Sequence, residues 1–508
     1  MTVRMTFDTR KKIRFPIGQI VAGLSLITVC VITGLLAALV PPGQLVRILV
    51  LPAGLGFLAL CWMLRRDDAG LPRRGVFILL MIAVCLSVLW PRYVFFSLGG
   101  PYVNPQTLSV FASLAAIVFW AAYSPGFSKK FYSVIFSSSN IGLLVVMWLG
   151  WRLFASALGE FAVVSVFDYA RDLVYVSSFF LIGCAIATYE DGPKWMLRVL
   201  VASGLMVATS GLIEAFIQRN YFVQFASGGD TQATADALKT IMFDKTRDGN
   251  FRAQSTFDHP IVFAQFIAAV IPLAAYIAFF ERHWIWRLVG FLVVPIGVLA
   301  IVKSGSRAGI VSLAVALSFV GVFVWMRAIT SKGFGRVFAI AILPILLFGL
   351  TIGYFVVQEL VLGRSNSEAG SSAVRLKMVG DSVSALYESP LWGFGHGMAL
   401  YKAGVISGHT GVATLDSLLL TIALDSGYVG FVLFLAIILL FSIKSGLAAI
   451  RLRDQEGARV GMLVASVLAL IATFAGLSIS NNMTLLWLLV AITLPSIKKV
   501  DVTTSQHL

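Results

Sequence analysis

Apolar runs of roughly 17–25 residues, the length that spans the hydrocarbon core of a bilayer, recur along almost the whole chain of 508 residues. Hydrophobic residues make up 58% of the sequence and charged residues only 12%, about half the charged share of an ordinary soluble domain. Because lipid cannot satisfy exposed backbone groups, such runs must form helices. The sequence therefore predicts an all-α polytopic membrane protein without a large soluble domain.

The apolar runs predict about 12–14 transmembrane helices, since two of the runs are short for a bilayer. They fall near residues 17–40, 45–64, 75–90, 106–123, 138–157, 171–189, 197–217, 258–280, 286–303, 309–326, 337–357, 417–443, 460–479 and 483–496. We expect both termini to lie in the cytoplasm. With that orientation, 24 of the 39 lysine and arginine residues fall in cytoplasmic segments, in agreement with the positive-inside rule.

The net charge of +15 does not indicate nucleic-acid binding, because the cations lie in short connectors between spans. The four cysteines lie inside apolar segments without CxxC spacing, which argues against a disulfide framework and against a zinc site. Cysteines in such positions pack as small core residues. The sequence indicates no metal and no other cofactor.

Two long outer loops divide the chain into five parts. These are N-terminal transmembrane helices at 1–217, a first periplasmic loop at 218–257, central helices at 258–357, a large periplasmic loop at 358–416, and C-terminal helices with a cytoplasmic tail at 417–508. Loops of this length in a compact protein are usually functional or disordered. In the large loop, apolar residues near helical spacing predict an amphipathic helix along the outer surface: Val374, Met378, Val379, Val383 and Tyr387.

The stretch KSGSRAGIV, residues 303–311, forms an outer turn in this topology, and the next span begins near residue 308. Ser304 or Ser306 can cap that helix. Arg307 falls in the first turn, where the helix dipole disfavours a cation unless an anion binds there as well. A helix N-terminus, a serine hydroxyl and an arginine together suit a phosphate. The alternative is that Arg307 reaches lipid headgroups.

Four motifs between about residues 250 and 435 occur in an order found in one bacterial family. They are STFDHPIVFAQF at 255–266, SGSRAG at 304–309, ESPLWGFGHG at 388–397 and DSLLLTIALDSGYVGF at 416–431. Each motif is short, and their common order adds specificity. Together they resemble the bacterial O-antigen polymerase and O-antigen ligase superfamily.

The resemblance implies a metal-independent membrane glycosyltransferase with a helical bundle similar to GT-C enzymes, in the bacterial inner membrane. Such an enzyme takes a glycan from an undecaprenyl diphosphate, a polyprenyl carrier, at the periplasmic face and passes it to an acceptor sugar hydroxyl. Polymerisation of O-antigen or exopolysaccharide repeat units is the leading expectation. The alternatives are ligation to lipid A-core and, from another class, a polysaccharide transporter or flippase. Expected partners are membrane lipids, a separate flippase and a chain-length regulator.

A leaving diphosphate must be neutralised, and guanidinium groups suit that task. The residues that we expect to bind it are Arg307, Arg252, Arg375, Lys303 and Ser306. For Arg252 and Arg375 the alternative is an ordinary surface charge on a loop.

The acceptor hydroxyl also needs a general base. Members of the family usually have His-Asn where this sequence has Asp416 and Ser417. Asp416 is therefore one candidate, and His409 and His396 are the others. For each of the three, the alternative is a hydrogen-bonding role within the loop.

Three further residues are candidates for contacts with sugar rings. Trp392 and Tyr401 have aromatic faces that suit stacking, although aromatic residues also anchor proteins at membrane interfaces. His259 stands before Pro260 at the entry of a span. The resemblance places His259 near the site, and its simpler role is to cap that helix.

Overall fold

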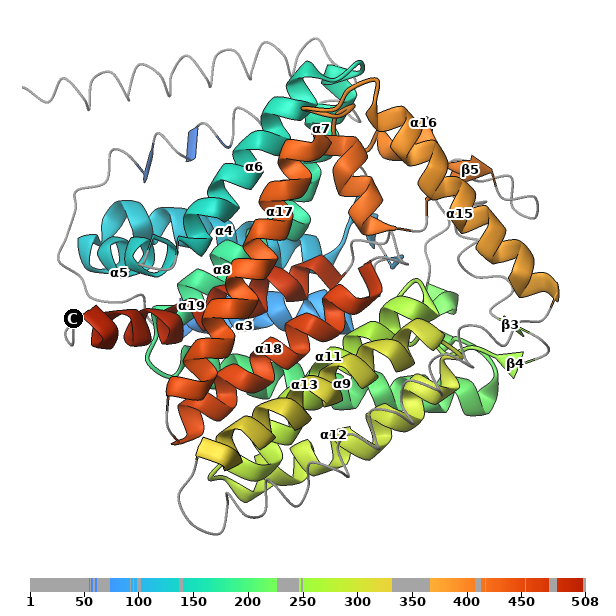
Figure 1. Cartoon of the computed structure of the whole chain (residues 1–508). Helices are drawn as coiled ribbons and strands as arrows, with labels where there is room; N and C mark the ends of the chain where they lie inside the picture. Colours follow the sequence, from blue (N-terminus) through green and yellow to red (C-terminus); the bar gives the residue numbers. More distant parts are fainter. Residues whose placement is uncertain are drawn as a thin grey trace, which may run out of the picture.

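The computed structural model describes residues 54, 56–57, 60–61, 74–91, 93–94, 96–97, 102–136, 140–225, 246–247, 250–330, 366–406, 413–415, 417–452, 454–474 and 482–505. Helices account for most of them, and ten continuous helical stretches are long and apolar enough to cross a membrane. The strand pairs in the described part of the chain have two residues per strand. The protein is an all-α polytopic membrane protein, as predicted (Figure 1).

The first half of the described chain forms helices joined by short turns. The π-helical turn η1 (Leu173–Ser177) joins two of them, so that residues 162–187 are one continuous stretch. The helices are α3 (Arg74–Leu89), α4 (Pro105–Tyr123), α5 (Pro125–Ile135), α6 (Ile141–Leu158), α7 (Ala162–Asp172), α8 (Ser178–Ala187) and α9 (Gly192–Ile217), followed by the 3-10 turn η2 (Tyr221–Phe225). The strand β1 (Phe96–Ser97) pairs with β2 (Tyr102–Val103).

The second half contains the longest helix, which bends within its length. The elements are β3 (Thr246–Arg247), β4 (Asn250–Phe251), α11 (Pro260–Phe280), α12 (Trp284–Lys303), α13 (Arg307–Thr330), α15 (Asn366–Leu386), α16 (Ala399–Ala403), β5 (Val405–Ile406), β6 (Ala413–Thr414), α17 (Leu418–Arg451), α18 (Asp454–Phe474) and α19 (Met483–Ser505). The strands pair as β3 with β4 and β5 with β6.

Each predicted span that falls on described residues coincides with a helix. The predicted spans 17–40 and 337–357 and most of 45–64 lie outside the described residues. The short span expected at 75–90 is the 16-residue α3. The last span is longer than predicted, because α19 continues through Pro495 to Ser505.

The sequence prediction omits helix α5. The connector expected at 124–131 forms most of α5. Ser124 ends α4, and its hydroxyl oxygen accepts the Phe127 N–H at 3.2 Å, which caps α5. The apolar residues of α5 recur at helical spacing and are buried: Phe127, Phe131, Val134 and Ile135. A short helix of this kind gains its stability from the buried face.

The core of the bundle is built around α11, α18 and α19, which are buried along most of their length. Their apolar residues cover all sides, as a buried helix requires. Polar side chains join the three helices. Gln265 Nε2 donates to the Leu470 carbonyl at 2.8 Å, and Asn482 Nδ2 donates to Gln265 Oε1 at 2.7 Å. In Figure 1 this core lies between α9 and α12 on one side and α17 on the other.

The contacts between connectors separate into two ends of the bundle. At one end, Arg198 near the start of α9 pairs with Glu281 in the turn before α12, with Nη2 and Oε1 3.0 Å apart. Both segments are expected in the cytoplasm. At the other end, the Ala253 N–H donates to the Lys303 carbonyl at 3.2 Å, which joins two segments expected outside. The pairings thus bring together segments that the topology predicts on the same side, and which end faces the periplasm stays a prediction. We use the name outer end for the second end.

Candidate active site

The turn between α12 and α13 lies at the outer end and is held by its own serines. Ser306 N–H donates to Ser304 Oγ at 3.1 Å, and Ser306 Oγ accepts the Gly309 N–H at 3.2 Å. Ser306 is therefore the residue that caps α13. Gly305 between the two serines has φ +58°, a conformation that favours glycine.

Arg252 packs against this turn from a segment about fifty residues earlier. Its Nε donates to the Ser304 carbonyl at 3.0 Å, and a Cβ at Gly305 would lie 3.3 Å from the Arg252 side chain. Arg307 is half-buried in the first turn of α13, and Lys303 is exposed. The structure therefore brings together four of the five residues predicted to bind diphosphate, which we call the cationic turn: Arg252, Lys303, Ser306 and Arg307.

The segment that carries Arg252 is fixed by buried polar groups. The Glu214 carboxylate of α9 accepts the Gln254 N–H at 3.3 Å and also accepts the Ser255 N–H. Asn220 Nδ2 donates to the Ser255 carbonyl at 3.0 Å, and Thr256 Oγ1 donates to the Val88 carbonyl at 2.8 Å. Arg252 is thus presented by an anchored segment.

His259 has the simpler of its two predicted roles. Its Nδ1 accepts the Ile261 N–H at 3.1 Å, so the imidazole caps α11. A contact of His259 with sugar stays a prediction.

Residues 388–398, which we call the glycine loop, dock onto α17. Gly393, Gly395 and Gly397 have φ values of 71°, 95° and 82°, a conformation that favours glycine. The Asp425 carbonyl accepts the Gly395 N–H at 3.0 Å. The Asp425 carboxylate accepts the N–H groups of Gly397 at 3.0 Å and of Ala399 at 2.9 Å.

The glycine loop lies so close to its neighbours that side chains are excluded at the contacts. Helix α17 bends at Gly427, which has φ 67° and ψ −176°. A Cβ at Gly427 would lie 2.2 Å from the Leu391 carbonyl oxygen, and a Cβ at Gly159 would lie 2.4 Å from that of Phe394. The bend and the α6–α7 turn therefore form a fitted seat for the loop.

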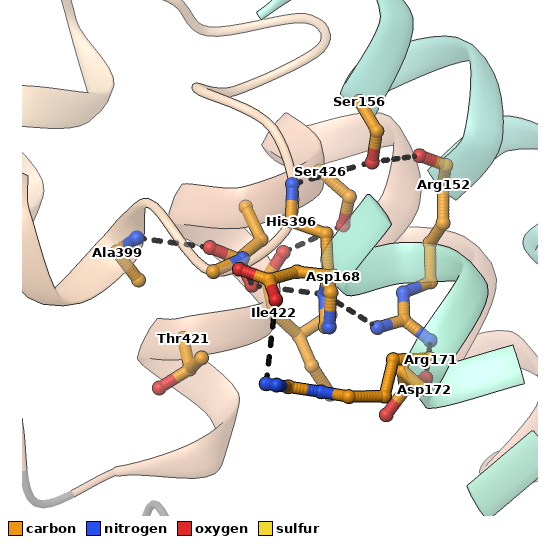
Figure 2. Close-up of polar contacts among 12 residues, drawn as sticks. Arg152, Ser156, Asp168, Arg171, Asp172, His396, Ala399, Thr421, Ile422 and Ser426 are labelled. Carbon is orange, nitrogen blue, oxygen red and sulfur yellow. Dashed lines mark hydrogen bonds and ion pairs between the residues drawn. The ribbon is translucent and has the colours of Figure 1, made fainter. Parts of the chain in front are cut away.

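Arg152 of α6 contacts the same loop from within the bundle (Figure 2). Its Nη1 lies 2.8 Å from Asp172 Oδ2, and its Nη2 lies 2.8 Å from His396 Nδ1. The guanidinium carbon lies 4.6 Å from the ring centroid of Trp148 and 5.3 Å from that of Tyr169. The side chain is 9% exposed, so a buried cation is paired with a carboxylate and two aromatic faces.

The sequence prediction assigns no role to Arg152. The signal was present, because Arg152 is a single arginine within the apolar run at 138–157. Ionisable residues inside membrane spans are costly and are generally paired or functional.

The contact with Arg152 determines which nitrogen of His396 carries a proton. A guanidinium group only donates, so Nδ1 accepts and the neutral ring has its proton on Nε2. Asp425 Oδ2 lies 3.3 Å from the same Nδ1. With the Arg152 contact formed, Nε2 is a donor, whereas a general base must accept a proton.

Lys402 of α16 attaches the chain beyond the glycine loop. Its Nζ lies 2.8 Å from Glu160 Oε2 in the α6–α7 turn. This hydrogen bond raises the pKa of Lys402. The same Nζ lies 4.7 Å from the ring centroid of Phe394.

The helix predicted in the large loop is α15. Of the apolar residues predicted at helical spacing, Met378 is buried in the protein, whereas Val379, Val383 and Tyr387 are exposed. Among the side chains of α15 that the structure describes, those buried are Met378, Ser382, Ala385 and Leu386. Their hydrophobic members pack with Phe394 and Leu424, so the docked glycine loop and α17 decide which face is covered.

The other predicted site residues fall into two groups. Trp392 and Tyr401 are exposed at the outer end, and Arg375 belongs to α15. Asp416 and His409 lie outside the described residues.

Residues 292–435 match the family model of O-antigen ligase. No curated protein matches the chain significantly. The matched part begins within α12 and ends within α17, so it contains most of the cationic turn, the glycine loop and Asp425. Arg152 and Arg252 precede it. The match supports the resemblance to the O-antigen polymerase and ligase superfamily that the motifs indicated.

Proposed function

We propose that this protein transfers a glycan from undecaprenyl diphosphate to an acceptor sugar hydroxyl at the periplasmic face of the inner membrane. Its family implies a glycosyltransferase-like polymerase or ligase that uses a lipid-linked glycan donor and an acceptor. Our proposal adds three points: the carrier is undecaprenyl diphosphate, the reaction takes place at the periplasmic side, and the mechanism is the one described below.

One observation carries the proposal: Arg252 is held against the turn that contains Lys303 and Arg307. Three cations from two separate segments meet where α13 begins, with a serine cap beside them. A helix N-terminus with guanidinium groups binds phosphate oxygens through N–H donors and positive charge. The outer end of the bundle is also the depth at which a polyprenyl carrier keeps its diphosphate.

The reaction requires that charge be stabilised as it develops. The anomeric C–O bond breaks and its electron pair stays on the diphosphate, while the acceptor oxygen forms the new bond and its proton passes to a base. Arg307 and Arg252 stabilise the leaving diphosphate, because a guanidinium fork can bind two phosphate oxygens at once. Lys303 adds charge. These residues do the work that a metal does in other glycosyltransferases.

We assign the base to Asp416, with His409 as the alternative. Asp416 occupies the position where the family usually has histidine, directly before Ser417, whose hydroxyl caps α17 by accepting the Leu420 N–H at 3.3 Å. His396 does not suit this role, because its exposed nitrogen is a donor in the geometry with Arg152.

We favour polymerisation of O-antigen or exopolysaccharide repeat units over ligation to lipid A-core. The specific observation is the replacement of His-Asn by Asp416 and Ser417, a departure from the usual family motif.

The experiment is transfer in nanodiscs that contain the purified protein and undecaprenyl diphosphate linked to one fluorescent repeat unit. We expect a ladder of products that lengthens in steps of one repeat unit, that does not need lipid A-core and that persists with EDTA. The control is Arg307→Ala at equal amount and equal thermal stability, which should give no ladder.

Each other result contradicts a defined part of the proposal. A single product that forms only with lipid A-core would make the protein a ligase. Movement of the labelled donor across a liposome membrane without a new glycosidic bond would make it a transporter. Loss of the ladder with EDTA would contradict the metal-independent mechanism.

The topology has its own test. Cysteines introduced after Asp244 and after Gly370 should react with a membrane-impermeant maleimide in intact spheroplasts. Protection of either site until the cells are lysed would place that loop in the cytoplasm.

A further inference from the structure

One nitrogen of His396 faces away from the buried charges. Its Nδ1 is held by Arg152 at 2.8 Å and Asp425 at 3.3 Å. The two ring nitrogens point in divergent directions, so Nε2 is directed away from this pair. Within the part of the chain that the structure describes, Nε2 has no hydrogen-bond partner, and the side chain is 19% exposed. It offers an oriented N–H donor at the surface of the glycine loop.

Asp168 of α7 supplies an acceptor next to the residue that follows His396. A Cβ at Gly397, the residue after His396, would lie 3.2 Å from Asp168 Oδ2. The Asp168 side chain is 35% exposed and forms an ion pair with Arg171, with Oδ1 and Nη2 3.3 Å apart. Figure 2 shows the Arg171 side chain reaching the Asp168 carboxylate, with His396 drawn in the same group of residues.

The charge of this region argues for a neutral ligand. Arg152 and Arg171 are the cations, and Asp168, Asp172 and Asp425 are the carboxylates. With a neutral imidazole the group has one more negative than positive charge, which disfavours a phosphate. An exposed N–H donor next to a carboxylate acceptor suits a ligand that both accepts and donates, as adjacent hydroxyl groups of a sugar ring do.

We propose that His396, Asp168 and Arg171 form a glycan-binding subsite separate from the cationic turn. One sugar hydroxyl accepts from His396 Nε2–H, and a hydroxyl of the same ring donates to the Asp168 carboxylate. Arg171 holds the carboxylate in place and donates to a further sugar oxygen. Arg152 acts as a positioning residue, since its contact with Nδ1 keeps the His396 proton on Nε2. The inference rests on the proposed function for the identity of the ligand as a glycan.

The test measures binding of a soluble glycan without the lipid. The probe is an oligosaccharide of two repeat units, released from the producing strain's own polysaccharide, and its binding to nanodisc protein is followed by saturation-transfer NMR and calorimetry. We expect Asp168→Ala to weaken binding roughly 10- to 100-fold, the range for losing a hydrogen bond to a charged group. Asp191→Ala is the matched control, because Asp191 forms an exposed ion pair with Lys194 at the same spacing at the other end of the bundle.

A second pair of variants distinguishes hydrogen bonding by His396 from its contribution to packing. His396→Gln keeps an acceptor for Arg152 and a donor for the sugar, so it should bind the oligosaccharide within a few-fold of the parent. His396→Leu lacks both groups and should bind about as weakly as Asp168→Ala. Thermal unfolding of each variant checks that the fold is kept. Unchanged oligosaccharide affinity in Asp168→Ala, or equal loss in His396→Gln and His396→Leu, would overturn the subsite.

An anion probe keeps the failure of the subsite distinct from the failure of the proposed function. Inorganic diphosphate should bind Asp168→Ala as it binds the parent, and should bind Arg307→Ala more weakly. A parent protein that binds the oligosaccharide but forms no glycosidic bond would refute the proposed function and leave the subsite in place. A parent that polymerises while Asp168→Ala keeps full glycan affinity would refute only the subsite.

Discussion

Two groups of arginines at the outer end of the bundle differ in how their charge is used. Arg152 is buried, and its guanidinium is divided between Asp172 and His396 beneath two aromatic faces. In the cationic turn, Arg252 donates to a backbone carbonyl, and Lys303 reaches the surface. A carboxylate inside the protein neutralises the first arginine, whereas the turn gathers three cationic residues at the start of α13, with Lys303 exposed. The comparison separates a cation that holds the fold from cations that suit a ligand.

The largest effect should follow from removal of the buried cation. Arg152→Met leaves Asp172 without its cation and His396 without its donor. We expect a loss of about 3–5 kcal/mol in the free energy of unfolding, as for other buried pairs that lose one partner. The measurement is chemical unfolding in detergent, followed by the fluorescence of the buried Trp148. Arg171→Ala, which removes an exposed arginine, should change the same quantity by about 1 kcal/mol or less. Equal losses in the two variants would contradict the structural role that we assign to the buried Arg152.

Arg307→Lys tests the other side of the comparison. An ammonium group is a point charge and cannot reproduce a bidentate fork. We expect transfer to fall roughly 100- to 1000-fold, about 2.7–4 kcal/mol of transition-state stabilisation, with the unfolding free energy unchanged. Initial rates with the lipid-linked donor measure this effect. Full activity in Arg307→Ala would contradict a role in diphosphate binding and favour the alternative, contact of Arg307 with lipid headgroups.

Gly427→Ala tests the seat that keeps the glycine loop over Arg152. Its φ of 67° and the 2.2 Å approach to Leu391 leave no room for a methyl group, so we expect a loss of about 1–3 kcal/mol and faster proteolysis within residues 388–404. Gly446 lies in the same helix with nothing within 4 Å of an added Cβ. Gly446→Ala should be neutral or slightly stabilising. Similar behaviour of both variants would contradict a fitted seat.

The smallest effect concerns the ion pair at the opposite end. Burial favours the neutral form of Glu281, but hydrogen bonds from Arg198 and from the Arg282 N–H outweigh it, and the pKa of Glu281 is lowered from 4.5. A lowered pKa in the fold means that this stabilisation is present above pH 4.5 and is lost as pH falls through the folded value. The parent should therefore lose roughly 1 kcal/mol more than Glu281→Gln on acidification from pH 6 to pH 3. Parallel melting curves for the two proteins across this range would contradict it.

The features that could be predicted from the sequence alone depend on residues that are close to one another along the chain. The apolar runs predicted the helices because lipid forces backbone groups to pair within each segment. A serine cap at the start of α13 follows from side-chain preferences within a few residues, although the structure was needed to choose Ser306 over Ser304. Lys303, Ser306 and Arg307 lie within five consecutive positions, so a single turn is sufficient to bring them together. The family motifs lie in the same continuous stretches.

Only the tertiary structure decided what Arg152, Asp425 and α15 do. His396 and Arg152 are 244 positions apart, so no local pattern shows that one holds the proton of the other in place. The face of α15 that packs against the protein depends on the glycine loop and α17, and apolar spacing alone does not identify it. Contacts of this kind gain their energy from burial and pairing across distant segments. These contacts form only when the helices have packed into the bundle and the glycine loop has docked at the bend at Gly427.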